Sequence, residues 1–106
     1  MAYDEQTAAR VRRILSPRTG VVERKMMGAL AFMVNGSMCC SVGRDWLLVR
    51  VGAEDREATL SMPHVEPMTL GAKTMSGFVR VAPEGYVTEG ALARWIGQGI
   101  KAACGS

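Results

Sequence analysis

The Asn35-Gly36 pair, which lies between two apolar runs, constrains the fold of this chain more than any other feature of its sequence. An Asn-Gly pair in this setting favours a two-residue type I′ turn, because both central residues of that turn need a positive φ. A second turn signal at Gly43-Arg44-Asp45 leads into a third apolar run, which begins at Trp46. Residues 25–51 therefore predict three antiparallel strands joined by tight turns.

The register of the first turn predicts which side chains share a face of this sheet. Val34 lies opposite Ser37 in a two-residue turn, and Met33 then lies opposite Met38. Continued without interruption, this register places an apolar set on the face that packs against helices: Ala29, Ala31, Met33, Met38, Cys40, Val42, Leu47, Val49 and Val51. Serines and Cys39 lie on the opposite, mixed face, together with Leu30, Phe32, Val34, Trp46, Leu48 and Arg50.

A mixed face with this much apolar surface is typical of a contact surface. We therefore expect a protein partner or a second copy of the chain to bind six residues of the mixed face: Leu30, Phe32, Val34, Trp46, Leu48 and Arg50. The alternative is that a later strand, helix or loop of the same chain covers them. A register slip of one residue would exchange the two faces.

The remaining segments predict three helices and two further strands. An early helix starts at Asp4 as its N-cap and ends at the Ser16-Pro17 pair. The other predicted elements are an extended segment at 21–25, a helix at 53–60, strands at 68–70 and 76–82 separated by a turn at 71–74, and a helix from Thr88 or Glu89. The order αβββαββα predicts one domain, residues 1–106, of the α+β class, with two layers in which an antiparallel sheet packs against helices.

Composition limits the class of protein. The chain has 106 residues, of which 48% are hydrophobic and 22% charged, as in a soluble globular domain. It contains no apolar run of the roughly 20 residues that a membrane helix needs, and its N-terminal residues are polar and charged. An odd number of cysteines, 3, with two of them adjacent, argues for reduced thiols. We therefore expect a cytoplasmic protein.

Basic residues gather near the start of the chain, whose net charge is +3. A basic cluster is the usual footprint of nucleic-acid binding, so direct binding of nucleic acid is an alternative function. The residues concerned are Arg10, Arg12, Arg13, Arg18, Arg24 and Lys25. Helical geometry favours a plain solvated face instead, because it distributes the first three around the solvent half of the early helix.

The thiols offer the other alternative function. Cys39, near Arg50 across the strands, would have a lowered pKa and act as a thiol-based redox sensor. A small hydrophobic cysteine in a strand is the commoner case. His64 is the only histidine, and neither a Cys-x-x-Cys pair nor a histidine pair is present to hold a metal. We expect no metal, no cofactor and no enzymatic activity.

Several motifs in order resemble those of the N-terminal domain of the TfoX/Sxy family. They are Lys25-Met26-Met27-Gly28-Ala29-Leu30-Ala31-Phe32, Val34-Asn35-Gly36-Ser37-Met38-Cys39-Cys40, Leu48-Val49-Arg50-Val51-Gly52, Pro67-Met68 and Met75-Ser76-Gly77-Phe78-Val79. The resemblance implies an α+β fold with helices on one side of an antiparallel sheet. It also implies a regulatory role in natural competence, through contacts with a transcription regulator. We expect a stand-alone, homodimeric domain without the family's C-terminal domain.

Overall fold

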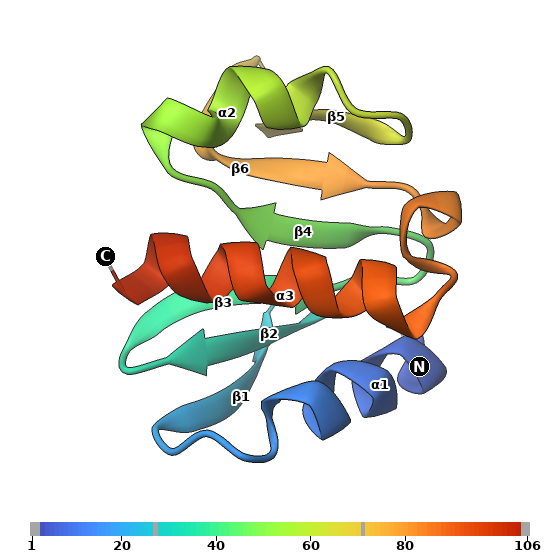
Figure 1. Ribbon diagram of the computed structural model, residues 1–106, viewed down its shortest axis with the longest axis vertical. Coiled ribbons are helices and arrows are strands. Elements are labelled where there is room, and N and C mark those ends of the chain that lie inside the picture. Colours follow the sequence, from blue (N-terminus) through green and yellow to red (C-terminus); the bar gives the residue numbers. More distant parts are fainter. Residues whose placement is uncertain (1–2, 27, 71, 105–106) are drawn as a thin grey trace.

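The structure is a computed structural model that describes residues 3–26, 28–70 and 72–104 (Figure 1). The helices of these residues are α1 (Glu5–Leu15), α2 (Ala53–Leu60), the 3₁₀ helix η1 (Pro83–Tyr86) and α3 (Glu89–Cys104). The strands are β1 (Val21–Met26), β2 (Ala29–Val34), β3 (Ser37–Val42), β4 (Leu47–Arg50), β5 (Val65–Leu70) and β6 (Lys73–Val81). The predicted class and order are confirmed, and the extended segment before the first hairpin forms β1.

All six strands join one antiparallel sheet in the order β1-β2-β3-β4-β6-β5. The last two strands are longer than predicted, because they pair with each other as a hairpin on the edge of the sheet. Gly71 of the predicted turn and Met27 of the family motif lie outside the described residues. The α-helices lie on one side of the sheet, which faces the viewer in Figure 1.

Two rows of side chains form the sheet's contribution to the core, on the face beneath the helices. One row runs from β2 to β5 through Leu30, Val42, Leu47, Val81 and Val65. The next runs through Phe32, Cys40, Val49 and Val79 and ends at Pro67, which is exposed on the edge strand. Leu92 and Ile96 of α3 are fully buried and belong to the same cluster, as do Val11 and Leu15 of α1.

The first hairpin confirms the predicted turn but contains a bulge that the sequence did not reveal. Asn35 and Gly36 both have positive φ, and Met33 lies opposite Met38 as expected. The register then shifts, so that Phe32 lies opposite Cys40 and Cys39 is the extra residue. The predicted faces are therefore correct for β4 and for Cys40, Ser41 and Val42 of β3, whereas those of β2 and of the start of β3 are inverted.

Burial explains why the bulged register is preferred. It places Leu30, Phe32 and Val34 in the core, where they are at most 2% exposed. The regular register would have buried Ala29, Ala31 and Met33 there instead. The first set is larger, and burial stabilises by roughly 25 cal/mol for each Å² of apolar surface removed from water.

Short-range hydrogen bonds set the start of α3, the helix that covers the centre of the sheet. The hydroxyl of Thr88 accepts a hydrogen bond from the Ala91 backbone N–H at 3.1 Å, as an N-cap residue does.

Among the described residues no helix is long and apolar enough to cross a membrane.

Candidate interaction surfaces and a pocket

The sheet face opposite the helices is the first candidate surface, and we call it the helix-free face. One row of its side chains crosses every strand: Arg24, Ala31, Ser41, Leu48, Arg80 and Glu66, from β1 to β5. Met33, Met38, Trp46, Arg50 and Phe78 lie on the same face beside this row. Its centre is apolar or small, and charged side chains stand at its ends.

Arginines on the helix-free face lie against aromatic rings. The guanidinium of Arg50 is 4.8 Å from the centroid of the Phe78 ring, and that of Arg80 is 5.6 Å from the Trp46 ring. Arg50 also donates a hydrogen bond from Nε to the Met38 carbonyl at 2.6 Å. The Arg50–Phe78 and Arg80–Trp46 contacts are cation–π contacts. The apolar side chains at the centre of the face are buried, since Ala31, Leu48 and Phe78 are at most 7% exposed.

The six residues of the predicted interaction surface divide between the two faces. Trp46, Leu48 and Arg50 lie on the helix-free face, as expected. Placing Leu30, Phe32 and Val34 on the same exposed surface was wrong, because the bulge turns β2 over and buries them under the helices. A surface that includes all six does not exist in this fold.

Ion pairs within the chain hold the three arginines of α1. Arg12 makes two hydrogen bonds to the carboxylate of Glu23 on β1, which lower the pKa of Glu23. Arg10 and Arg13 both pair with Glu89 at the start of α3. Arg10 also donates to the Tyr86 carbonyl at 2.9 Å and to the two carbonyls that follow it.

The other basic residues of the predicted nucleic-acid set do not extend this group. Arg24 lies on the helix-free face, whereas Lys25 follows it on the helix side of β1. Arg18 is exposed in the loop before β1. The fold therefore directs the six basic side chains to different sides of the molecule, which does not match one track of phosphates.

Both adjacent cysteines lie in the core, so the expected exposure of Cys39 on the mixed face was wrong. The bulge places Cys39 beneath α3, with Sγ 3.6 Å from the Ile96 carbonyl. A hydrogen bond with Cys40 lowers the pKa of Cys39 and, together with burial, raises that of Cys40 well above its usual value. Neither side chain is exposed to solvent, and a reactive thiol needs exposure.

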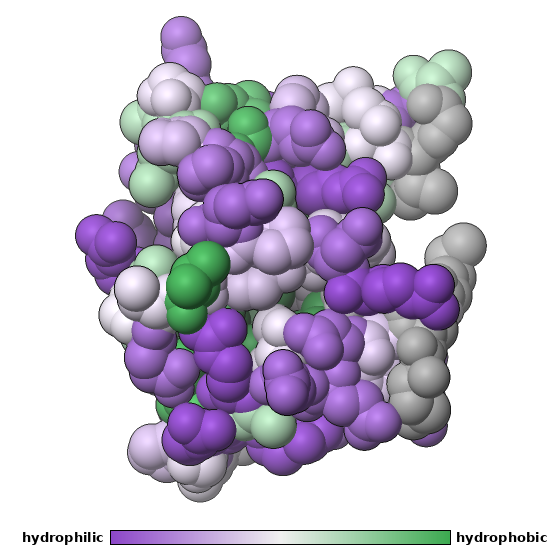
Figure 2. Space-filling model, turned by 90° about the vertical axis from the view of Figure 1, so that its right-hand side faces the viewer, coloured by the Kyte–Doolittle hydropathy of each residue, from purple (hydrophilic) through white to green (hydrophobic). Residues whose placement is uncertain are grey.

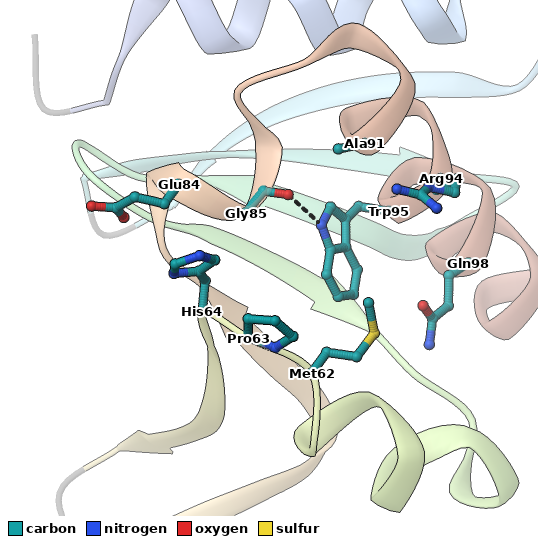
Figure 3. Close-up of a pocket in the computed structure, with 9 residues that line it drawn as sticks. All are labelled: Met62, Pro63, His64, Glu84, Gly85, Ala91, Arg94, Trp95 and Gln98. Carbon is teal, nitrogen blue, oxygen red and sulfur yellow. Dashed lines mark hydrogen bonds between the residues drawn. The ribbon is translucent and has the colours of Figure 1, made fainter.

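A cavity of about 330 Å³ lies on the helix side, between α3, η1 and the loop after α2 (Figure 3). Its wall is formed by Met62, Pro63, His64, Glu84, Gly85, Ala91, Arg94, Trp95 and Gln98. In Figure 3 the Trp95 ring stands at the centre, with His64 and Glu84 on one side of it and Arg94 and Gln98 on the other. We call this cavity the Trp95 pocket.

Sequence patterns did not reveal this pocket. Its residues come from three segments that are far apart along the chain, and only the fold brings them together. One sequence signal was present, because His64 is a single histidine between two prolines. The structure gives it φ +68°, a value that residues with a side chain rarely adopt. Phe78 and Arg80 on the helix-free face were also missed, although alternation along β6 would have placed them there.

Figure 2 shows the side with the N-terminus as mostly hydrophilic, with hydrophobic residues in small separate patches. Within residues 3–26, 28–70 and 72–104, no group of three or more His, Cys, Asp or Glu side chains is placed to hold a metal ion.

Comparison with known proteins identifies the family. The family model for the TfoX N-terminal domain matches residues 13–103, which is nearly the whole chain. No curated protein and no solved structure matches it. The match includes β1, the bulged hairpin and all of the helix-free face. The chain belongs to the TfoX N-terminal domain family.

Proposed function

We propose that this domain is a non-enzymatic regulatory module that binds the acidic surface of a transcription regulator through its helix-free face. The observation that carries the proposal is the pair of arginines held over aromatic rings on a sheet face that no described helix covers. Arginine and aromatic residues are enriched at protein interfaces and dominate their binding energy. Membership of the TfoX N-terminal domain family supports a regulatory role.

The charge of the face selects its partner. Among the described residues of this face, Arg24, Arg50 and Arg80 stand against a single acid, Glu66, whose Oε1 lies 3.8 Å from Nε of Arg80. A partner with acidic side chains would complement this pattern and would be attracted from a distance. Two copies of the face would bring their arginines together, which disfavours a face-to-face homodimer. The predicted homodimer stays a prediction, which light scattering over a range of concentrations would test.

Apolar side chains on β1 extend the same face. Val22 and Met26 alternate with Arg24 along this strand, and they are 55% and 42% exposed. These exposed apolar groups lie beside the charged row and would contribute buried area to an interface. The combination suits a partner with an apolar patch and acids around it.

Both edges of the sheet are poorly suited to adding a strand from a partner. Glu23, Arg24 and Lys25 occupy the middle of β1, and charged side chains on an edge strand discourage pairing. On the other edge, β5 contains Pro67 and a bulge next to it, and proline has no N–H to donate. A partner would therefore meet the face of the sheet and not its edges.

The test is capture of partners by the tagged domain in its own host cells, with the captured proteins identified by mass spectrometry. The wild-type domain should capture a transcription regulator. Arg24→Glu and Arg80→Glu should each reduce capture of that protein by about tenfold or more, because a like charge replaces an attraction. Arg13→Glu, an exposed arginine on the opposite side, is the matched control and should have no effect. Equal capture by all three variants would refute the proposed surface.

Direct nucleic-acid binding and redox sensing by Cys39 stay predictions. For nucleic acid, the purified domain should be mixed with single- and double-stranded DNA at low salt, where phosphate contacts are strongest. Binding that Arg12→Glu and Arg13→Glu abolish, and that Arg80→Glu leaves intact, would favour the basic segment over the helix-free face.

A further inference from the structure

We propose that the Trp95 pocket binds a small aromatic carboxylate with a hydrogen-bond donor at its far end. Its volume of about 330 Å³ falls within the range of small-molecule sites, roughly 300 to 1,000 Å³. At about 30 Å³ for each water molecule in the liquid, this is the space of roughly eleven waters. A single substituted ring fits within that space. This site is separate from the helix-free face and goes beyond the proposed function.

Three hydrogen bonds fix the walls of the pocket before any ligand enters. The Trp95 indole N–H donates a hydrogen bond to the Gly85 carbonyl at 3.0 Å, which fixes the orientation of the ring (Figure 3). The side-chain amide of Gln98 donates to the Thr59 hydroxyl at 2.8 Å. The His64 carbonyl accepts the Ala82 N–H at 2.8 Å and holds the left-handed backbone there. Such preorganisation reduces the entropy that binding would cost.

The apolar part of the pocket suits a flat ring. The Trp95 indole forms part of the pocket wall and is 5% exposed, and Met62 stands near its lower end in Figure 3, with Pro63 beside it. Met62 is 45% exposed, although methionine is among the residues that are most often buried. A flat ring placed against Met62 and the exposed part of the indole would cover the thioether, and sulfur–aromatic contacts are favourable.

The polar groups give the ligand its direction. Arg94 and Gln98 lie one helical turn apart on the same side of Trp95. Within the described part of the chain, Arg94 makes no ion pair. Its guanidinium can bind a carboxylate through two parallel hydrogen bonds, and the second N–H of the Gln98 amide is available as a further donor.

The opposite side of the pocket favours a donor on the ligand. Glu84 and His64 lie there (Figure 3), and a carboxylate only accepts hydrogen bonds when it is ionised. Glu84 would also repel a second negative charge. The ligand's carboxylate therefore points to Arg94, and a hydroxyl or amino group points to Glu84. We choose 4-hydroxybenzoate as the probe, because it has this arrangement on one ring.

The test is a titration of the ¹⁵N-labelled domain with 4-hydroxybenzoate, followed by NMR. The indole N–H signal of Trp95 and the side-chain amide signal of Gln98 should shift in a saturable manner. The indole signal of Trp46, on the helix-free face, is an internal control and should not move. The titration should extend to about 10 mM of the probe, which is enough to detect a dissociation constant of roughly 1 mM. Absence of saturable shifts up to that concentration would overturn the proposal.

Matched probes and variants test the assigned contacts. Arg94→Gln should weaken 4-hydroxybenzoate binding by about tenfold or more, the loss expected for a charge-assisted hydrogen bond, and should leave 4-hydroxybenzamide binding unchanged. Lys101→Gln, a charge loss on the same helix outside the pocket wall, is the control. Glu84→Gln should reduce the preference for 4-hydroxybenzoate over benzoate. Equal affinities for acid and amide in the wild type would refute the role of Arg94.

Discussion

Tyr86 is the buried ionisable side chain with the clearest consequence at the scale of a single residue. It lies at the end of η1, is 5% exposed and belongs to the main core cluster. Burial raises the pKa of its hydroxyl to about 12, and the negative charges of Asp4 and Asp45 act in the same direction. The neutral phenol is therefore the form that the folded state prefers.

This pKa predicts a loss of stability at high pH. In the unfolded chain the tyrosine ionises near pH 10, so the folded state binds more protons between pH 10 and about 12. The contribution of Tyr86 is complete below pH 10 and declines as the pH rises through this interval. Chemical denaturation of the wild type should show a steeper fall between pH 9 and 11.5 than Tyr86→Phe does.

Absorbance at alkaline pH gives a direct check. The chain has 2 tyrosines, so in the Tyr3→Phe variant only Tyr86 contributes to the tyrosinate signal. That signal should appear with a midpoint near pH 12. A midpoint near pH 10, or the same pH dependence of stability in wild type and Tyr86→Phe, would contradict the burial argument.

At the scale of secondary-structure elements, the packing of α3 on β3 depends on a missing side chain. A Cβ atom on Gly99 would lie 2.5 Å from the Cys39 carbonyl oxygen and 2.9 Å from its Sγ. The backbone of the bulge therefore approaches the helix closely. Gly97, on the exposed side of the same helix, has no atom within 4 Å of the equivalent position.

The two glycines form a matched pair for mutation. Gly99→Ala should lower the free energy of unfolding by roughly 1–2 kcal/mol, because overpacking outweighs the gain in helix propensity. Gly97→Ala should raise it by up to about 1 kcal/mol, since only the propensity changes. Urea denaturation of both variants measures the two effects. A stabilising Gly99→Ala would show that β3 and α3 are not in close contact.

The elements also show how far the sequence predicts this fold. Turn chemistry is local, and so Asn35-Gly36 and the helix boundaries at Asp4 and Thr88 were predictable. The bulge at Cys39 was not, because local rules favour a regular hairpin and only burial of the larger side chains of β2 overrides them. The Trp95 pocket was beyond sequence reasoning, since it depends on contacts between segments that are distant along the chain.

At the scale of the whole molecule, the reactivity of the three thiols indicates whether the fold is intact. Cys104 is exposed near the end of α3, whereas Cys39 and Cys40 are buried. A thiol reagent should therefore modify one of the three thiols quickly in the native protein and the other two only when the fold opens. Adding urea should accelerate the slow reactions.

The variant Cys104→Ser isolates the buried pair. It should show no fast reaction at neutral pH without denaturant, and a complete reaction after unfolding. A fast reaction of Cys39 in this variant would mean that α3 opens readily, and would support the redox-sensor hypothesis.

The bulge has a consequence for changes in chain length. Because Cys39 is the extra residue of β3, the strand is one residue longer than its partner requires. A deletion there would remove the bulge and leave every other side chain of the hairpin on its present face. A deletion of another residue of β3 that keeps the bulge would shift the register by one residue. The side chains after the deleted residue would then exchange the inner and outer faces of the sheet. Among related sequences, a missing residue in this strand is therefore tolerable at one position, beneath the glycine of α3.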